Sequence, residues 1–173
     1  MTLASNQVLL QFLYVTAYAL DGFAFAVEAL VGRYFGAGDR ARLRRAVVMC
    51  FQWGGVTVVI LALAIALGGG ALVDLMAKGA GVQDTARIYL PWMVAAPLIG
   101  AASWMFDGVF IGATRTRDMR NMMIISALVY ALAVWALMPV YGNHGLWAAL
   151  MISFIARGVT LGLRYPALER AAA

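Results

Sequence analysis

The stretch AVVMCFQWGGVTVVILALAIALG, residues 46–68, contains 23 consecutive residues without a charged side chain. A helix needs about 20 such residues to cross the hydrocarbon core of a bilayer, which is about 30 Å thick. The run lacks the alternation of apolar and polar residues found in a membrane barrel and is too long for one of its strands. It therefore predicts a transmembrane α-helix.

Four further stretches have the same character, so the sequence predicts five spans, at about residues 7–32, 46–68, 88–113, 121–141 and 145–164. Hydrophobic residues make up 64% of the chain and charged residues 12%, against about 45–50% and about 25% in soluble domains. This composition excludes a disordered chain, a nucleic-acid-binding domain and an ordinary cytosolic enzyme. We expect an all-α membrane protein, residues 1–173 forming a single bundle, with a short interfacial helix at residues 71–78.

The placement of basic residues predicts how the spans are oriented. Cytoplasmic segments near span ends carry an excess of Lys and Arg. One side of the predicted topology receives ten basic residues, and the other receives only Lys78 and Arg87. The ten are Arg33, Arg40, Arg42, Arg44, Arg45, Arg115, Arg117, Arg120, Arg164 and Arg170. We therefore expect an external N-terminus and a cytoplasmic C-terminus, and we attribute the net charge of +5 to topology and not to a nucleic-acid partner.

Charged side chains within a span are costly and are therefore candidates for function. Asp21 and Glu28 share one face of the first span with the aromatic residues Tyr14, Tyr18 and Phe25. Lipid offers such a face no hydrogen-bond partner, and carboxylates beside aromatic rings can hold a cation. The alternative is a polar seam that only fixes helix packing. Glu28 lies one turn from the cytoplasmic end, where Arg33 or water could satisfy it.

Asp107 and Arg157 are the other two charged residues within predicted spans. Asp107 shares a face with Gly100, Ser103, Trp104 and Ile111, and Pro97 predicts a kink about three turns away. A structural bond to a neighbouring helix is the competing role for Asp107. We expect Arg157 to snorkel or to pair with a carboxylate such as Asp107. His144, in the predicted external turn, is expected to be a loop or interface residue.

No catalytic motif such as HExxH, GxSxG or a Walker glycine loop occurs, so we expect no enzyme and no cofactor. Any transport would then use an ion gradient or a partner protein.

Three stretches resemble the multidrug and toxic compound extrusion (MATE) family, in the branch named after DNA-damage-inducible protein F. They are YALDGFAFAVEALVG at 18–32 with GAGDR at 36–40, DGVFIGATRTRDMR at 107–120, and GNHGLWAAL at 142–150. The similarity runs from about residue 3 to about residue 168. It implies two six-helix bundles related by pseudo-two-fold symmetry. This chain resembles the last five helices of the C-terminal bundle, so the N-terminal bundle is expected to be missing from it.

The resemblance also implies secondary antiport in the bacterial inner (plasma) membrane, with drugs or cations leaving as protons or sodium enter. Acidic residues of the C-terminal bundle bind cations in this family, which suggests a sodium site at Asp107. The implied partners are membrane lipids, cationic or amphipathic small molecules and the missing N-terminal bundle. The candidate substrate- and ion-binding residues are Asp21, Glu28, Asp107, Tyr14, Tyr18 and Phe25. Two alternatives stay open: a flippase for lipid-linked precursors from the same superfamily, and a non-transporting scaffold or truncated product.

Overall fold

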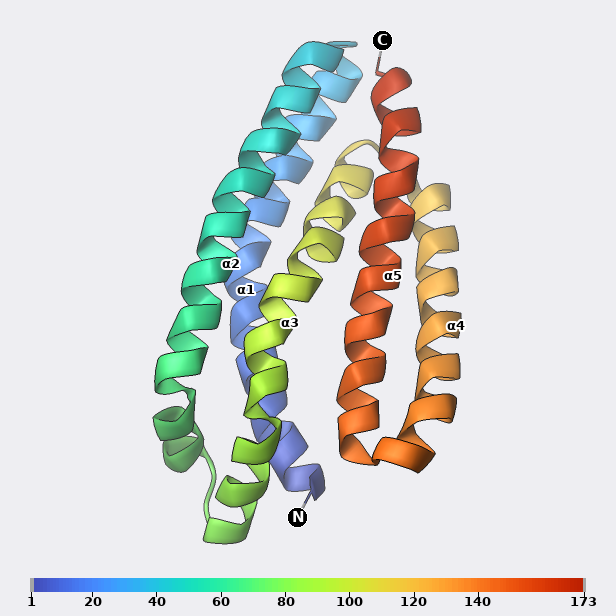
Figure 1. Cartoon of the computed structure of the whole chain (residues 1–173). Helices are drawn as coiled ribbons and strands as arrows, with labels where there is room; N and C mark the ends of the chain where they lie inside the picture. Colours follow the sequence, from blue (N-terminus) through green and yellow to red (C-terminus); the bar gives the residue numbers. More distant parts are fainter. Residues whose placement is uncertain (1, 173) are drawn as a thin grey trace.

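The computed structural model describes residues 2–172, which form a bundle of five long helices (Figure 1). They are α1 (Thr2–Gly36), α2 (Arg40–Met76), α3 (Ala80–Gly112), α4 (Thr116–Tyr141) and α5 (Asn143–Arg170). All five are long and apolar enough to span a membrane. Each predicted span falls on its own helix, which confirms the prediction of an all-α membrane protein.

The predicted interfacial helix at residues 71–78 is wrong, because α2 continues unbroken to Met76. Glycine weakens a helix, and the two glycines at 69 and 70, after the predicted span, indicated a break here. Packing on α3 outweighs that weakness. A Cβ added at Gly69 would lie 3.1 Å from the methyl carbons of Leu90, and Val73 is fully buried. The last turns of α2 are therefore held against the neighbouring helix.

Short connections make sequence neighbours antiparallel. The helices are joined by residues 37–39, 77–79, 113–115 and 142 alone. In the first connection, the Asp39 carboxylate caps α2 by accepting a hydrogen bond from the Arg42 backbone N–H at 2.9 Å. In the last, Gly142 adopts a positive φ of 54°, which glycine reaches without the strain that a side chain adds. Successive connections therefore lie at opposite ends of the bundle.

The packing divides the bundle into a body of α1, α2 and α3 and a hairpin of α4 and α5, which contacts the body mainly through α3 and α5 (Figure 1). Residues from α3 enter both hydrophobic clusters. One cluster, near the Arg-rich end, includes Val31, Leu43 and Phe110, and the other includes Leu9 and Trp147. By contrast, only Met122 and Ser126 of α4 are buried. The α3 helix is therefore the centre of the bundle, and α4 lies at its edge.

Two prolines lie within α3, at positions 91 and 97, and the helix remains continuous through both. Its axis is bent in Figure 1. Pro97 is buried, and Ser103 bonds locally, its hydroxyl donating to the Gly100 carbonyl at 2.7 Å. This bent helix carries Asp107 into the middle of the bundle.

Candidate functional site

One face of α3 meets α1 with the two backbones in close contact. A Cβ added at Gly112 would be closer to the Glu28 carbonyl oxygen than real Cβ atoms come, and one at Gly108 would be equally close to the Ala24 carbonyl. Small residues four apart are the usual means by which membrane helices approach this closely. Because only hydrogen fits at these two positions, they fix α3 against α1.

Another face of α3 meets α5 through an ion pair. The Arg157 Nη2 atom lies 2.5 Å from Asp107 Oδ2, and the two side chains are 19% and 16% exposed. Close packing supports this contact, since a Cβ added at Gly158 would lie 3.6 Å from the Ser103 backbone nitrogen. Of the two roles expected for Arg157, snorkelling and pairing with a carboxylate, the structure has the pairing with Asp107.

The ion pair leaves one polar atom free on each partner. Asp107 Oδ1 and Arg157 Nε are both buried and have no hydrogen-bond partner within residues 2–172. Buried polar atoms are almost always satisfied, and these two are of opposite kind, because Oδ1 accepts a hydrogen bond and Nε–H donates one. Arg157 also lines a cavity of about 230 Å³ between α4 and α5, together with Ser126, Tyr130 and Ser153. Its lining thus combines one charged and three hydroxyl-bearing side chains with the apolar Met123, Ala127, Leu150 and Phe154.

The aromatic members of the predicted α1 stripe are largely exposed. The exposed fractions are 48% for Tyr14, 71% for Tyr18 and 67% for Phe25. Asp21 and Glu28 are half-buried, and neither belongs to an ion pair within the described part of the chain. The side chains of this stripe therefore have few contacts with the rest of the bundle.

Glu28 and Phe25 line a second cavity, of about 440 Å³, between α1 and the end of α3. Arg33 and Gly112 line the same cavity, although Arg33 does not pair with Glu28. Asp107, in contrast, forms its ion pair with Arg157 of α5. The six predicted residues therefore do not form one site: Phe25 and Glu28 share a cavity, Asp107 joins Arg157, and the others line the outer face of α1.

His144 joins two helix ends, as expected of an interface residue. Its Nδ1 accepts a hydrogen bond from Trp92 Nε1 at 3.1 Å, and its ring centroid lies 4.6 Å from that of Tyr89. Beside it, the Asn6 and Asn143 side-chain amides exchange two hydrogen bonds, at 2.7 and 2.9 Å. These contacts tie the first turns of α5 to α1 and α3.

A profile of the MatE family matches residues 1–137 of the chain. The chain belongs to the MatE family. It is 39% identical over 159 residues to DNA damage-inducible protein F of Escherichia coli (strain K12), an alignment that covers 92% of this chain and 34% of that protein. The MatE chain is also 28% identical over 151 residues to Protein DETOXIFICATION 42 of Arabidopsis thaliana, covering 87% and 29% of the two chains.

A third relative is the Probable multidrug resistance protein NorM of Xanthomonas campestris pv. campestris, with 28% identity over 169 residues, covering 86% of the MatE chain and 33% of NorM. The MatE chain thus spans about a third of the length of these relatives. No solved structure matches it. The resemblance drawn from the three quoted stretches is confirmed.

Sequence reasoning missed two features of this MatE chain. The first is the close contact of α1 and α3, for which the pattern Gly108-Val-Phe-Ile-Gly112 was an available signal. The second is the polar lining around Arg157, formed by Ser126, Tyr130 and Ser153. These residues come from two helices and carry no charge, so no pattern within one span could single them out.

Proposed function

We propose that this MatE chain forms part of a secondary active transporter that exports toxic compounds across the bacterial inner membrane. Family membership supports transport and not catalysis, and one relative is named a probable multidrug resistance protein. The observation that carries the proposal is the ion pair of Asp107 and Arg157, buried between two membrane-spanning helices with one carboxylate oxygen unpartnered. Ionisable groups placed in this way typically serve ion pathways in transporters.

In this proposal, Asp107 Oδ1 is the atom that takes up the coupling ion, a proton or sodium. Arg157 occupies Oδ2, so the ion and the guanidinium compete for the charge of one carboxylate. Uptake of the ion would weaken the hold of α5 on α3. A difference in ion affinity between two arrangements of these helices is what couples an ion gradient to a conformational change.

The cavity that Phe25 and Glu28 line is the proposed contact for a cationic, amphipathic substrate. An aromatic face and a carboxylate attract a cation together, and Arg33, which lines the same cavity, offsets part of this attraction. The volume of about 440 Å³ lies within the range of small-molecule sites. The exposed ring of Tyr18 would complete the binding surface against the N-terminal bundle that the family resemblance implies. Export therefore requires that partner bundle, and we expect no export by this chain alone.

The test is a chimera in which the matched third of the Xanthomonas NorM relative is replaced by this chain. In cells that lack their own efflux pumps, the chimera should lower the accumulation of ethidium or another lipophilic cation, and Asp107→Asn and Glu28→Gln should abolish that effect. Immunoblots and gel filtration establish that each variant is folded and inserted. A folded chimera that exports no cation, beside an active NorM parent, would refute the proposal.

Ion coupling is tested in everted membrane vesicles that contain the chimera. A pH gradient and a sodium gradient are imposed separately, and one of them should drive uptake of the cationic substrate into the vesicles. Asp107→Asn should abolish uptake driven by that gradient. The isolated chain in liposomes serves as a second test. Export by the monomeric chain would contradict the need for a partner bundle.

A further inference from the structure

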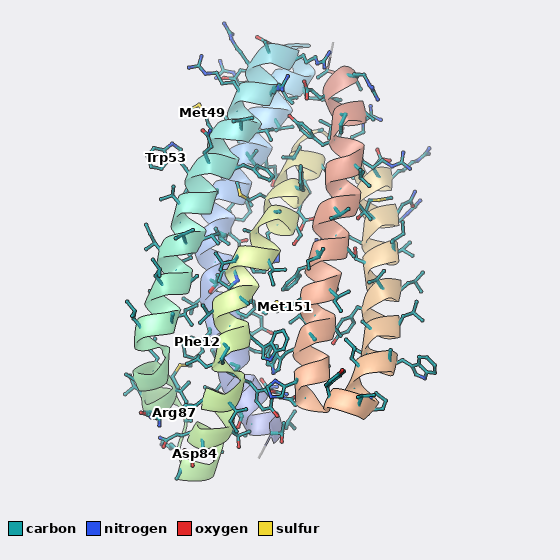
Figure 2. All side chains as sticks on the ribbon, in the orientation of Figure 1. Phe12, Met49, Trp53, Asp84, Arg87 and Met151 are labelled. Atoms are coloured by element: carbon teal, nitrogen blue, oxygen red, sulfur yellow. The ribbon has the colours of Figure 1, made fainter. Side chains whose placement is uncertain are left out.

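A long cavity lies between α1 and α2, next to the connection that joins them. Its volume is about 570 Å³, and most of its lining is apolar: Phe23, Leu30, Met49 and Trp53 are among the side chains that form it. Met49 and Trp53 project from the outer side of α2, so the cavity opens on the surface of the bundle (Figure 2). In a membrane, this surface would face lipid or another protein.

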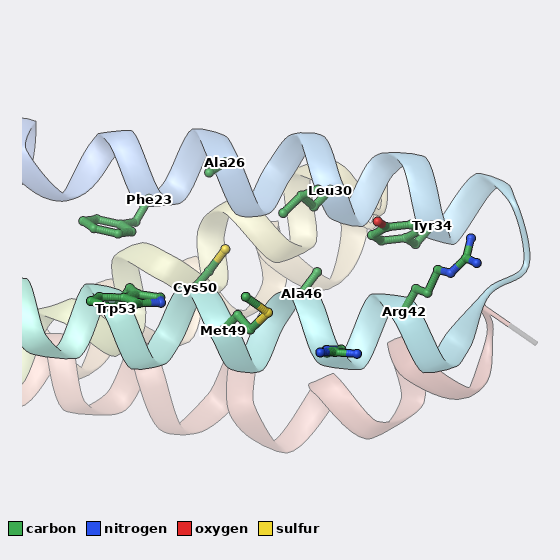
Figure 3. A pocket seen from close by; sticks show the side chains of 10 residues that line it. Phe23, Ala26, Leu30, Tyr34, Arg42, Ala46, Met49, Cys50 and Trp53 are labelled. Atoms are coloured by element: carbon green, nitrogen blue, oxygen red, sulfur yellow. The ribbon is translucent and has the colours of Figure 1, made fainter.

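The cavity is polar at one end only. Figure 3 places Phe23 and Trp53 at the end far from the connection, and Tyr34 and Arg42 at the end near it, with Met49 and Cys50 between. Arg45 also lines the cavity, one turn along α2 from Arg42. The lining therefore changes from apolar to cationic along the direction of the helices.

The positive charge at this end is only partly compensated. Arg42 Nε lies 3.3 Å from the Asp39 carboxylate, whereas Arg45 forms no ion pair within residues 2–172. No acidic residue lines the cavity. Glu169, a buried carboxylate at this end of the bundle, is bound to Arg40 at 3.1 Å. The cationic end is therefore available to an anion.

We propose that this cavity binds one anionic phospholipid. The headgroup phosphate would contact Arg42 and Arg45, and an acyl chain would lie along Phe23, Met49 and Trp53. Both guanidinium groups lie within the first two turns of α2, where a helix that spans a membrane meets the headgroups, and basic pockets between such helices bind anionic headgroups. A packed protein helix would leave the cationic end without a counter-ion, whereas a phospholipid matches both ends. The site is separate from Asp107 and goes beyond the proposed export function.

The first test is native mass spectrometry of the purified chain, titrated with phosphatidylglycerol or with phosphatidylcholine of the same acyl chains. Phosphatidylglycerol should bind more tightly. Each basic residue near a membrane surface contributes about 1 kcal/mol to anionic lipid binding, so Arg45→Gln should weaken phosphatidylglycerol binding about fivefold. Arg44→Gln is the matched control, since it removes the same charge from the adjacent, exposed position outside the cavity, and it should change binding less than twofold.

The second test fills the apolar part without changing the charge. Ala26 lines the cavity and Ala19 does not, although both are exposed on α1 two turns apart. Ala26→Trp should lower phosphatidylglycerol binding at least fivefold, and Ala19→Trp should leave it unchanged. Glycerol phosphate, which has the headgroup chemistry without acyl chains, should not compete at equal concentration.

Four results would overturn the proposal. Equal affinity for phosphatidylglycerol and phosphatidylcholine would show that charge has no part in binding. Equal losses in the Arg44→Gln and Arg45→Gln variants would show that the charge acts diffusely and not at the cavity. Unchanged binding in Ala26→Trp, or full competition by glycerol phosphate, would show that no acyl chain occupies the cavity.

Discussion

Removal of one partner from the Asp107–Arg157 pair should destabilise the bundle strongly, and removal of both should cost less than the sum. Breaking a buried ion pair typically costs about 3–5 kcal/mol, because the remaining charge is left buried and unpaired. These side chains retain 16% and 19% exposure, so we expect the lower end, about 3 kcal/mol, for Asp107→Asn and for Arg157→Gln.

The double variant shows whether this loss arises from the pair. Independent effects would add to about 6 kcal/mol. If the loss arises from one unpaired charge, the double variant has none and should lose about 3 kcal/mol or less, since replacing both charges is often close to neutral. The expected coupling energy is therefore at least about 3 kcal/mol.

Equilibrium unfolding of the purified chain in mixed micelles, with rising sodium dodecyl sulfate followed by far-UV circular dichroism, measures these differences. Arg164→Gln and Asp84→Asn are the controls, because both residues are exposed and unpaired within residues 2–172. Each should shift stability by less than about 0.5 kcal/mol. Single variants that behave like these controls, or a double variant whose loss equals the sum, would refute the reasoning.

Three further outcomes are expected. Gly112→Ala should destabilise the chain by about 1–3 kcal/mol in the same unfolding assay, because its Cβ meets the α1 backbone, whereas Gly22→Ala, with nothing within 4 Å, should not. Asp21→Asn in the NorM chimera should leave membrane levels normal and abolish coupled export of a lipophilic cation, because we expect this second carboxylate within a span to bind the ion or the cation, and Asn cannot ionise. Unchanged export would reduce Asp21 to a packing residue. In intact cells, a membrane-impermeant maleimide should label Tyr141→Cys and not Arg117→Cys, and the reverse pattern would invert the topology.

The helices could be predicted because each one follows from the residues of its own stretch of sequence. An apolar run such as residues 46–68 has one stable form in a bilayer, since a helix satisfies every backbone hydrogen bond within itself. Charges within such runs are equally visible, which is why Asp107 and Arg157 could be named, together with their pairing. A charged residue within an apolar run can be recognised from the sequence alone, without knowledge of the structure.

The direction in which each residue points could not be predicted in the same way. The continuation of α2 past Gly69 depends on Leu90 of another helix, and the division of α3 into a Gly108 face and an Asp107 face depends on both neighbours. Adjacent residues 107 and 108 thus contact different helices. The spacing along one helix says which residues share a face, but the identity of the facing helix comes from tertiary packing.

The kinds of contact in this bundle differ between α1 and α5, and the difference indicates where movement is easiest. On α1, α3 is held by backbone contact at Gly108 and Gly112, which no ion or water can replace. On α5, α3 is held by polar groups at two levels, His144 at one end and Arg157 in the middle, whereas Glu169 at the other end binds Arg40 of α2. Polar groups can exchange one partner for water, a proton or an ion. The close backbone packing of α1 and α3, in contrast, can be lost only if the two helices move apart. We therefore expect a change in charge at Asp107 to act on the seam between α3 and α5 and to leave α1 and α3 together.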